Sequence, residues 1–357
     1  MIEQTDFSPD WASPPGDTIM DVLRERQLSV SEFAEQIGQP VAVLNDLLQG
    51  RVKVSLELAR QLAGVCGGTI EFWMNRDFQY QLDRERKEAR NDSWLRELPL
   101  HDMVEFGWAA NRTQRDERLE ECLQFFAVPD LSAWEKRYRS MRAAVAFRTS
   151  PAFESKPGIV AAWLRKGEIE AEAIACEQWD GRTLRLLIEQ FRELAVEHDL
   201  RVFVPKLTQL CATAGVALVI VRAPRGCPAS GATRFITARK AIIQLSFRYL
   251  TDDQFWFTFF HEVGHLLLHS ANEFFLEGEE RTETTQEREA NEFAGSVLIP
   301  PEFLGRLLEI SPTTLNIARL ARQAGVSPGI VVGQLQHHKK IRPNHFNRLK
   351  ARYQWEQ

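Results

Sequence analysis

Apolar positions in the first hundred residues recur at helical spacing and are interrupted by short turns. Over 17–27 they stand at i, i+3 and i+4, which predicts one buried stripe along a helix. Ser29 and Glu32 then have capping-box spacing, so a second helix is expected to follow. Further helix starts and ends are marked by residues that cap or turn the chain: Gly38, Pro40, Gly50, Ser55 and Thr69. Helix, glycine turn and helix at this spacing indicate a helix-turn-helix module.

Beyond the first two hundred residues the pattern changes, because short apolar segments of strand length appear between helices. VALVIVR at 216–222 and KAIIQLS at 240–246 predict two strands, and the prolines and glycines of 224–231 predict a loop between them. Before these strands, helical patterns cover 158–178 and 181–198. The chain is therefore expected to be mostly α-helical with a small β-sheet, an α+β fold.

Composition narrows the class of protein. The chain has 357 residues, of which 44% are hydrophobic and 26% charged, as in ordinary globular proteins. The net charge of −5 argues against a chain wholly devoted to nucleic acid. No apolar stretch approaches the roughly 18–20 residues that cross a bilayer, so no membrane association is expected. The five cysteines form no CxxC pair and the first 17 residues lack lysine and arginine, which favours a reducing cytoplasm.

The segment QFWFTFFHEVGHLLLH at 254–269 carries the sharpest chemical signal. His261 and His265 are four residues apart on a helical pattern, so both imidazoles lie on one face and can share one ion. Zinc prefers a tetrahedral site, in which three protein ligands leave the fourth position to water. Glu262 can act as general base toward that water. The spacing therefore predicts a zinc-dependent enzyme that hydrolyses peptide bonds.

The third ligand is not fixed by this motif. His269 lies two turns beyond the first histidine and can line the site, but it cannot easily join the same tetrahedron. A metzincin would need a histidine at position 271, where the chain has alanine. A glutamate from a following helix is the remaining source, and the candidates are Glu287, Glu289 and Glu292. Glu287 and Glu289 point to different sides of a helix, so they are not expected to bind the ion together.

HEVGHLLLH at 261–269, followed by EREANEFAGSVLIPP at 287–301, resembles the ImmA/IrrE family of zinc metallo-endopeptidases. The resemblance implies that Glu289, directly before the Ala-Asn pair, is the third zinc ligand. It extends to ASGATRF at 229–235 as a loop, in which Arg234 would help to polarise a substrate carbonyl or else face solvent. KAIIQLS would be an edge strand that pairs with extended substrate, or else an internal strand.

The N-terminal module resembles the XRE helix-turn-helix class, and within it the HigA-like antitoxins, in FSPDWASPPGDTI and LSVSEFAEQIGQPVAVLNDLLQGR. The resemblance implies that residues 40–49 form a recognition helix for the major groove, with a homodimer reading paired half-sites. Two candidate side chains could read adenine edges and two could meet phosphates: Asn45 and Gln49, and Arg51 and Lys53. Residues 17–68 carry five basic and seven acidic residues, so docking to a protein is the alternative to DNA binding.

The sequence thus predicts a cytoplasmic transcriptional regulator fused to a Zn²⁺-dependent endopeptidase. The resemblance implies a protein substrate, often an XRE-type repressor, that is cleaved in a stress or mobile-element response. The alternative is a DNA-binding, antitoxin-like regulator whose peptidase fold senses a signal without cutting. Four segments are expected: a helix-turn-helix domain at 1–90, a helical middle region at 91–200, a zincin-like peptidase core at 201–310 and a basic helical region at 311–357.

Overall fold

The structure of the protein is a computed structural model that describes residues 12–139, 157–248, 250–269, 275–277 and 284–354. The chain divides into two compact units, residues 1–96 and 97–357, and each is described by itself. Helices predominate and one small mixed sheet lies in the second unit, which confirms the expected α+β class. The first five residues of the HigA-like segment FSPDWASPPGDTI lie outside the described residues.

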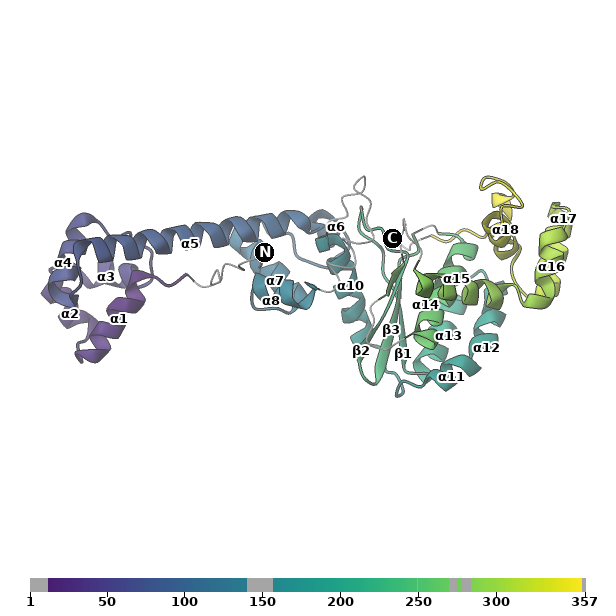
Figure 1. Ribbon diagram of the computed structural model, residues 1–357, viewed down its shortest axis with the longest axis horizontal. Helices are drawn as coiled ribbons and strands as arrows, with labels where there is room; N and C mark the ends of the chain where they lie inside the picture. The colour runs from purple at the N-terminus through teal and green to yellow at the C-terminus, as the bar shows by residue number, and fades with distance from the viewer. Residues whose placement is uncertain (1–11, 140–156, 249, 270–274, 278–283, 355–357) are drawn as a thin grey trace, which may run out of the picture. The chain divides into compact units, whose positions relative to one another are not determined.

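The first unit is built from helices joined by short turns, drawn in purple and blue in Figure 1: α1 (Pro15–Glu25), α2 (Val30–Ile37), α3 (Val41–Leu48), α4 (Leu56–Cys66) and α5 (Ile70–Glu97). The predicted capping box opens α2, because the Ser29 hydroxyl accepts a hydrogen bond from the Glu32 amide at 3.2 Å. The Glu32 carboxylate in turn accepts one from the Ser29 amide at 2.8 Å. Gly38 ends α2 with a φ of +67°, which glycine adopts without steric cost.

A hydrophobic core holds these helices together. Its members include one large side chain from each helix, and each of these is at most 1% exposed: Ile19, Phe33, Leu44, Leu62 and Trp73. The last helix continues through the charged stretch at 87–94. Lysine, arginine and glutamate are strong helix formers, and Arg84 pairs with Glu88 one turn further on at 3.4 Å. The charged stretch is therefore helical.

In the second unit, most helices precede the sheet: α6 (Leu100–Glu105), α7 (Arg115–Phe126), α8 (Leu131–Arg137), α10 (Pro157–Glu172), α11 (Gly181–Leu186), α12 (Ile188–Glu193), the 3-10 helix η1 (Leu194–Val196) and α13 (Leu200–Thr213). The helix predicted over 158–178 ends at Glu172. The pattern at 181–198 forms two short helices and a 3-10 turn, with the first break at Leu187. Helical periodicity thus located these segments but overestimated their continuity.

The sheet has the strand order β1-β3-β2-β4, with β1 at Val216–Ile220, β2 at Gly231–Thr237, β3 at Lys240–Leu245 and β4 at Phe275–Glu277. β3 pairs with β1 in parallel and with β2 antiparallel, and β4 is antiparallel to β2. Of the two alternatives for KAIIQLS, the internal strand is the one found, because β3 is paired on both sides. The segment predicted as a loop contains β2. This strand begins with Gly-Ala-Thr-Arg, which does not show the alternation of apolar and polar residues that predicts a strand.

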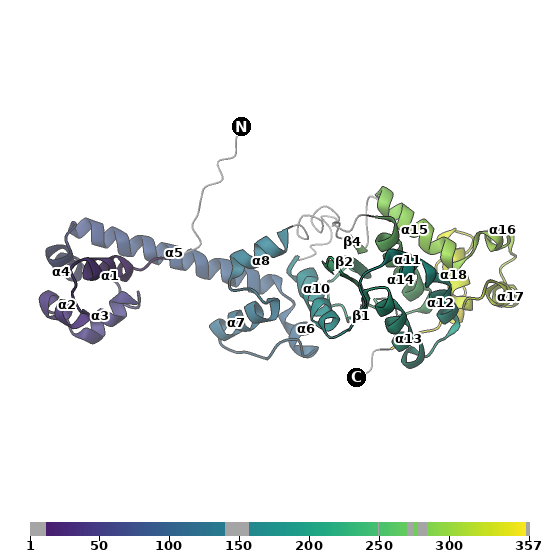
Figure 2. The same ribbon diagram turned by 90° about the horizontal axis from the view of Figure 1, so that it is seen from below.

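Helices cover both faces of this sheet, as Figures 1 and 2 show. α10 packs on one face, while α13 and α14 (Asp252–Leu268) pack on the other. The indole nitrogen of Trp163 on α10 donates to the Val221 carbonyl at 2.9 Å, and Gln244 on β3 donates to the Trp163 carbonyl at 2.7 Å. The remaining helices follow the strands: α15 (Thr285–Leu298), α16 (Pro301–Glu309), α17 (Thr314–Ala324), α18 (Pro328–His337) and the 3-10 helix η2 (Asn347–Leu349).

The C-terminal segment fixes the start of α14. Lys350 belongs to the region 311–357 that was expected to be basic and helical, yet it is only 10% exposed and lies 2.6 Å from the buried carboxylate of Asp253. Asp252 accepts a hydrogen bond from Ser327, the residue that caps α18, at 2.6 Å. Both acidic side chains lie in the first turn of α14, where the helix dipole favours negative charge. These contacts set the position of the helix that carries the histidine motif.

Candidate metal centre

The histidine motif lies on α14, which is anchored by aromatic side chains. Phe255, Trp256, Phe259 and Phe260 are at most 4% exposed and pack into the main core. The two histidines project from another face of the helix, one turn apart, as the four-residue spacing predicts. Their Nε2 atoms are 2.9 Å apart, and both side chains are buried. The packing of the aromatic face thus presents two imidazoles side by side.

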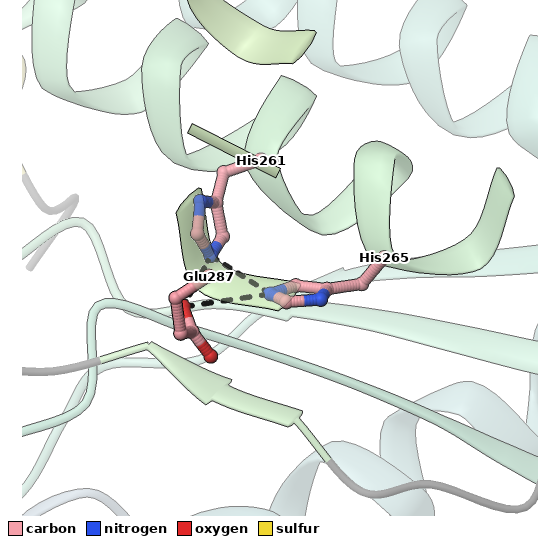
Figure 3. A group of neighbouring side chains, drawn as sticks. All are labelled: His261, His265 and Glu287. Carbon is pink, nitrogen blue, oxygen red and sulfur yellow. Dashed lines mark hydrogen bonds and ion pairs between the residues drawn. The ribbon is translucent and has the colours of Figure 1, made fainter. Parts of the chain in front are cut away.

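The third member of the group comes from α15. Gly264 lies between the two histidines in sequence, and a Cβ there would stand 3.3 Å from the Cα of Ala290. The absence of a side chain at Gly264 therefore lets α15 approach α14 closely. This approach places Glu287 Oε2 3.1 Å from His261 Nε2 and 3.6 Å from His265 Nε2, and Figure 3 shows the three side chains converging.

Glu289, the ligand implied by the family resemblance, is not brought to this group. Its side chain is 49% exposed, and its Oε2 atom lies 3.0 Å from Nε2 of His269 instead. Residues two apart on a helix are separated by about 200° around the axis. When Glu287 faces the histidines, Glu289 must therefore face elsewhere, and Glu287 is the glutamate that lies with them. Glu292, the other candidate, is exposed and pairs loosely with Arg288 at 3.9 Å.

The donor set and its dimensions fit zinc. Two imidazoles and one carboxylate are ligands that zinc accepts at about 2.0–2.2 Å, so ligand atoms on a tetrahedron are about 3.3 Å apart. The three separations between Nε2, Nε2 and Oε2 are 2.9, 3.1 and 3.6 Å, which bracket that value. Together these residues can hold one ion and leave a further position open.

Electrostatics favour the protonation states that metal ligands need, which are neutral imidazole and ionised carboxylate. Burial, together with the neighbouring His261, lowers the pKa of His265 to about 4. Burial alone would raise the pKa of Glu287, but hydrogen bonds from His261 and His265 outweigh it, so the pKa of Glu287 is lowered. Near neutral pH, His265 is thus neutral and Glu287 is ionised, and these are the forms in which each side chain can bind a cation.

Hydrogen bonds to the outer nitrogens orient the two imidazoles. Nδ1 of His261 lies 2.9 Å from Oδ1 of Asn291, and Nδ1 of His265 lies 3.0 Å from Nδ1 of His269. Sequence reasoning placed His269 near the site but missed Asn291. The signal was available, because Asn291 follows Glu287 by four residues and so shares its face of α15.

Glu262 lies beside the group with its carboxylate buried against β2. A Cβ at Gly231 would collide with Oε1 of Glu262, so the backbone of β2 passes directly over this carboxylate. Thr233, two residues further along the same face, is 3.4 Å from the Glu262 carbonyl through its hydroxyl. Sequence reasoning did not single out Gly231. Only glycine at this position lets the strand approach the carboxylate without displacing it.

Arg234 points away from the histidine group. It pairs across the sheet with Ile242, and side chains on a strand alternate between the two faces. Its guanidinium therefore reaches α10, where it donates to the Leu164 carbonyl at 2.9 Å and lies 3.5 Å from Glu168. The suggested role of Arg234 at a substrate carbonyl is incompatible with this placement.

One other cluster of metal-ligating side chains occurs among the described residues, at His101, Asp102 and Glu105. Arg225 already occupies it, because its side chain lies 2.8 Å from Asp102 Oδ1, 2.8 Å from His101 Nδ1 and 3.1 Å from Glu105 Oε2. Desolvation alone would raise the pKa of Asp102, but hydrogen bonds and charge from Arg225 lower it. This cluster is an ion-pair network that joins α6 to the loop before β2.

In the first unit, the four suggested DNA contacts lie on or just after α3, and all of them are exposed: Asn45, Gln49, Arg51 and Lys53. Arg51 is not a free cation, because its guanidinium lies 2.8 Å from Oδ1 of Asp46. A phosphate group would have to compete with this carboxylate for Arg51.

Comparison with known families agrees with the geometry of the second unit. Residues 219–336 match the Peptidase_M78 family, described as the IrrE N-terminal-like domain. The match to this IrrE-like domain includes His261, Glu262, His265 and Glu287, whereas the first unit lies outside it. No curated protein matches the chain. Among the described residues, no helix combines the length and apolar character needed to cross a membrane.

Proposed function

We propose that the chain is a zinc-dependent endopeptidase in which His261, His265 and Glu287 hold the metal and Glu262 is the general base. The observation that carries this proposal is the convergence of two Nε2 atoms and one carboxylate oxygen within 3.6 Å of one another. The likeness of residues 219–336 to the IrrE N-terminal-like domain supports it.

Bound zinc would supply Lewis acidity toward water and a peptide carbonyl. The residues of this chain do the rest. Glu262, held between α14 and the backbone at Gly231, takes a proton from water as the water attacks and passes it to the departing amine. Asn291 and His269 keep the imidazole rings turned so that Nε2 of each faces Glu287.

The test is zinc content followed by activity. Purified protein should contain about one zinc per chain. Glu287→Ala should lose most of it, whereas the matched control Glu292→Ala, an exposed glutamate on the same helix, should keep it. Glu262→Gln should retain zinc but lose about 10²–10⁴ in the rate of proteolysis. A wild-type protein that binds zinc but cuts no candidate repressor would favour the alternative, a regulator that senses without cutting.

We further propose that the first unit is an XRE-like module that directs a cytoplasmic enzyme, acting as a homodimer, to DNA or to a DNA-bound repressor. Two features support this role: the side-chain amides of Asn45 and Gln49 are exposed, and α2 and α3 are joined by a turn at Gly38. Arg51→Ala with Lys53→Ala should weaken binding to all DNA sequences and flatten its salt dependence. Asn45→Ala should instead relax sequence preference. If none of these variants changes binding to the protein's own promoter region, docking to a protein replaces DNA recognition.

A further inference from the structure

A line of three polar side chains leads from the histidine group to the protein surface. Nδ1 of His265 lies 3.0 Å from Nδ1 of His269, and Nε2 of His269 lies 3.0 Å from Oε2 of Glu289. The first side chain is 1% exposed, the second 4% and the third 49%. The line therefore begins beside the proposed metal and ends in solvent.

The chemistry of these groups allows one arrangement of protons when His265 binds a metal. A neutral imidazole has one N–H donor and one acceptor nitrogen. If Nε2 of His265 faces the ion, its proton is on Nδ1 and must be accepted by Nδ1 of His269. The proton of His269 is then on Nε2, where the ionised carboxylate of Glu289 accepts it. Every donor along the line meets an acceptor.

We propose that His269 and Glu289 are positioning residues that act on the metal through His265, in an order of carboxylate, imidazole, imidazole and metal. This inference rests on the proposed zinc site. Hydrogen bonding to the outer nitrogen of a ligand histidine fixes its tautomer and raises its basicity. Here the carboxylate of Glu289 does not contact His265 directly, because the imidazole of His269 lies between them. His261 differs, because its outer nitrogen meets the neutral amide of Asn291.

Two glutamates of the segment EREANEFAG, Glu287 and Glu289, have different roles in this arrangement. Glu287 and Glu289 face different directions on α15, yet both reach α14 or its C-terminal end, one at the histidine pair and the other at His269. His269 can take part because α14 ends at Leu268 and residue 269 has extended backbone, with φ of −118° and ψ of 171°. A helix cap thus turns the His269 ring toward both partners.

The experiment measures zinc affinity by competition with chelators, in the full-length protein. His269→Phe keeps a ring but removes both nitrogens, and Glu289→Ala removes the carboxylate. Each should weaken zinc binding by about 10–100-fold. Glu289→Gln, which keeps an acceptor without the charge, should recover part of the loss. Glu292→Ala is the matched control, and it should bind zinc as tightly as the wild type. The visible spectrum of the cobalt-substituted protein should change in His269→Phe and not in the control.

The double variant decides whether Glu289 acts through His269. Because His269→Phe already breaks the line, adding Glu289→Ala should cause no further loss of affinity. Additive losses would overturn the proposal, as would unchanged affinity in both single variants. A loss in Glu289→Ala as large as that in Glu287→Ala would make Glu289 a direct ligand and would also overturn it. If the wild-type protein bound no zinc, the proposed function itself would fail. If the wild type and both single variants bound zinc equally well, only the proposal about His269 and Glu289 would fail.

Discussion

The helices of the first unit and the histidine group of the second are held by interactions of different range. In the first unit, several helix ends are set by contacts within a few residues, as at Ser29 with Glu32 or at Gly38. In the second, Glu287 reaches the histidines only because α15 packs against Gly264, and Glu262 is held by a strand that precedes it in the chain. Local signals are enough to start and stop a helix, but a site needs contacts between distant segments.

This difference has a consequence for substitution. A change at a helix cap alters one short helix, so its cost is limited to about 0.5–2 kcal/mol. A change at a crossing point between segments moves functional groups relative to one another. A shift of about 1 Å at such a point can reduce a reaction rate by a factor on the order of 10². A residue that carries no chemistry itself can therefore affect function as strongly as the general base when it lies at such a crossing point.

The first prediction concerns Gly231, where β2 crosses the Glu262 carboxylate. Gly231→Ala would force the added Cβ against Oε1 of Glu262 and close to Thr258, so the carboxylate or the strand must move. We expect proteolysis to fall by a factor on the order of 10²–10⁴, comparable to removal of the base. Overpacking should also cost about 1–3 kcal/mol of stability. Rates on a cleavable protein and urea unfolding measure the two effects.

The control for this prediction is Gly305→Ala in α16, where an added Cβ meets no atom within 4 Å. It should leave both rate and stability unchanged or slightly improve stability, since alanine favours helix. If Gly231→Ala retained full activity, the close approach of β2 would not hold Glu262 in place, and the contrast between the two units would lose its main support.

The histidine group shows how far sequence could predict the site. The four-residue spacing of His261 and His265 predicted that both imidazoles lie on one face of a helix, and their Nε2 atoms are indeed 2.9 Å apart. The choice between Glu287 and Glu289 depends on which side of α15 faces α14, and that follows from packing at Gly264 and Ala290. No pattern within α15 alone contains this information, so the glutamate that the resemblance implies, Glu289, is not the one that lies beside the histidines.

The sheet shows the same limit for the fold. β1 and β3 are apolar runs and were predicted from their own residues. β2 begins Gly-Ala-Thr-Arg and forms a strand because β3 and β4 supply hydrogen bonds on both sides. The internal position of β3 likewise depends on which strands pair, and neither the run KAIIQLS nor its length specifies that. Helix starts in the first unit needed no such partner.

The second prediction tests whether the helices of the first unit depend on contacts between residues close in sequence. Ser55 caps α4 by accepting a hydrogen bond from the Leu58 amide at 3.2 Å. Ser55→Ala should reduce stability by about 1 kcal/mol, because that amide loses its partner. Ser31→Ala, an exposed serine inside α2, should have little effect. Native-state hydrogen exchange of α4 amides measures the change, and proteolytic activity should stay at the wild-type level. Loss of activity in Ser55→Ala would show that the first unit influences the second.

The last prediction compares two glycines at which small effects of opposite sign are expected from backbone conformation. An added Cβ would meet no atom within 4 Å at either Gly38 or Gly64, so packing plays no part. Gly38 has a φ of +67° at the end of α2, whereas Gly64 lies inside α4. Gly38→Ala should therefore destabilise the first unit by about 1 kcal/mol, because alanine is strained in the left-handed region. Gly64→Ala should stabilise it by about 0.5–1 kcal/mol through helix propensity. Amide hydrogen exchange in the first unit should become faster in Gly38→Ala and slower in Gly64→Ala. If exchange changed in the same direction in both variants, contacts beyond the local backbone would decide the stability of these helices.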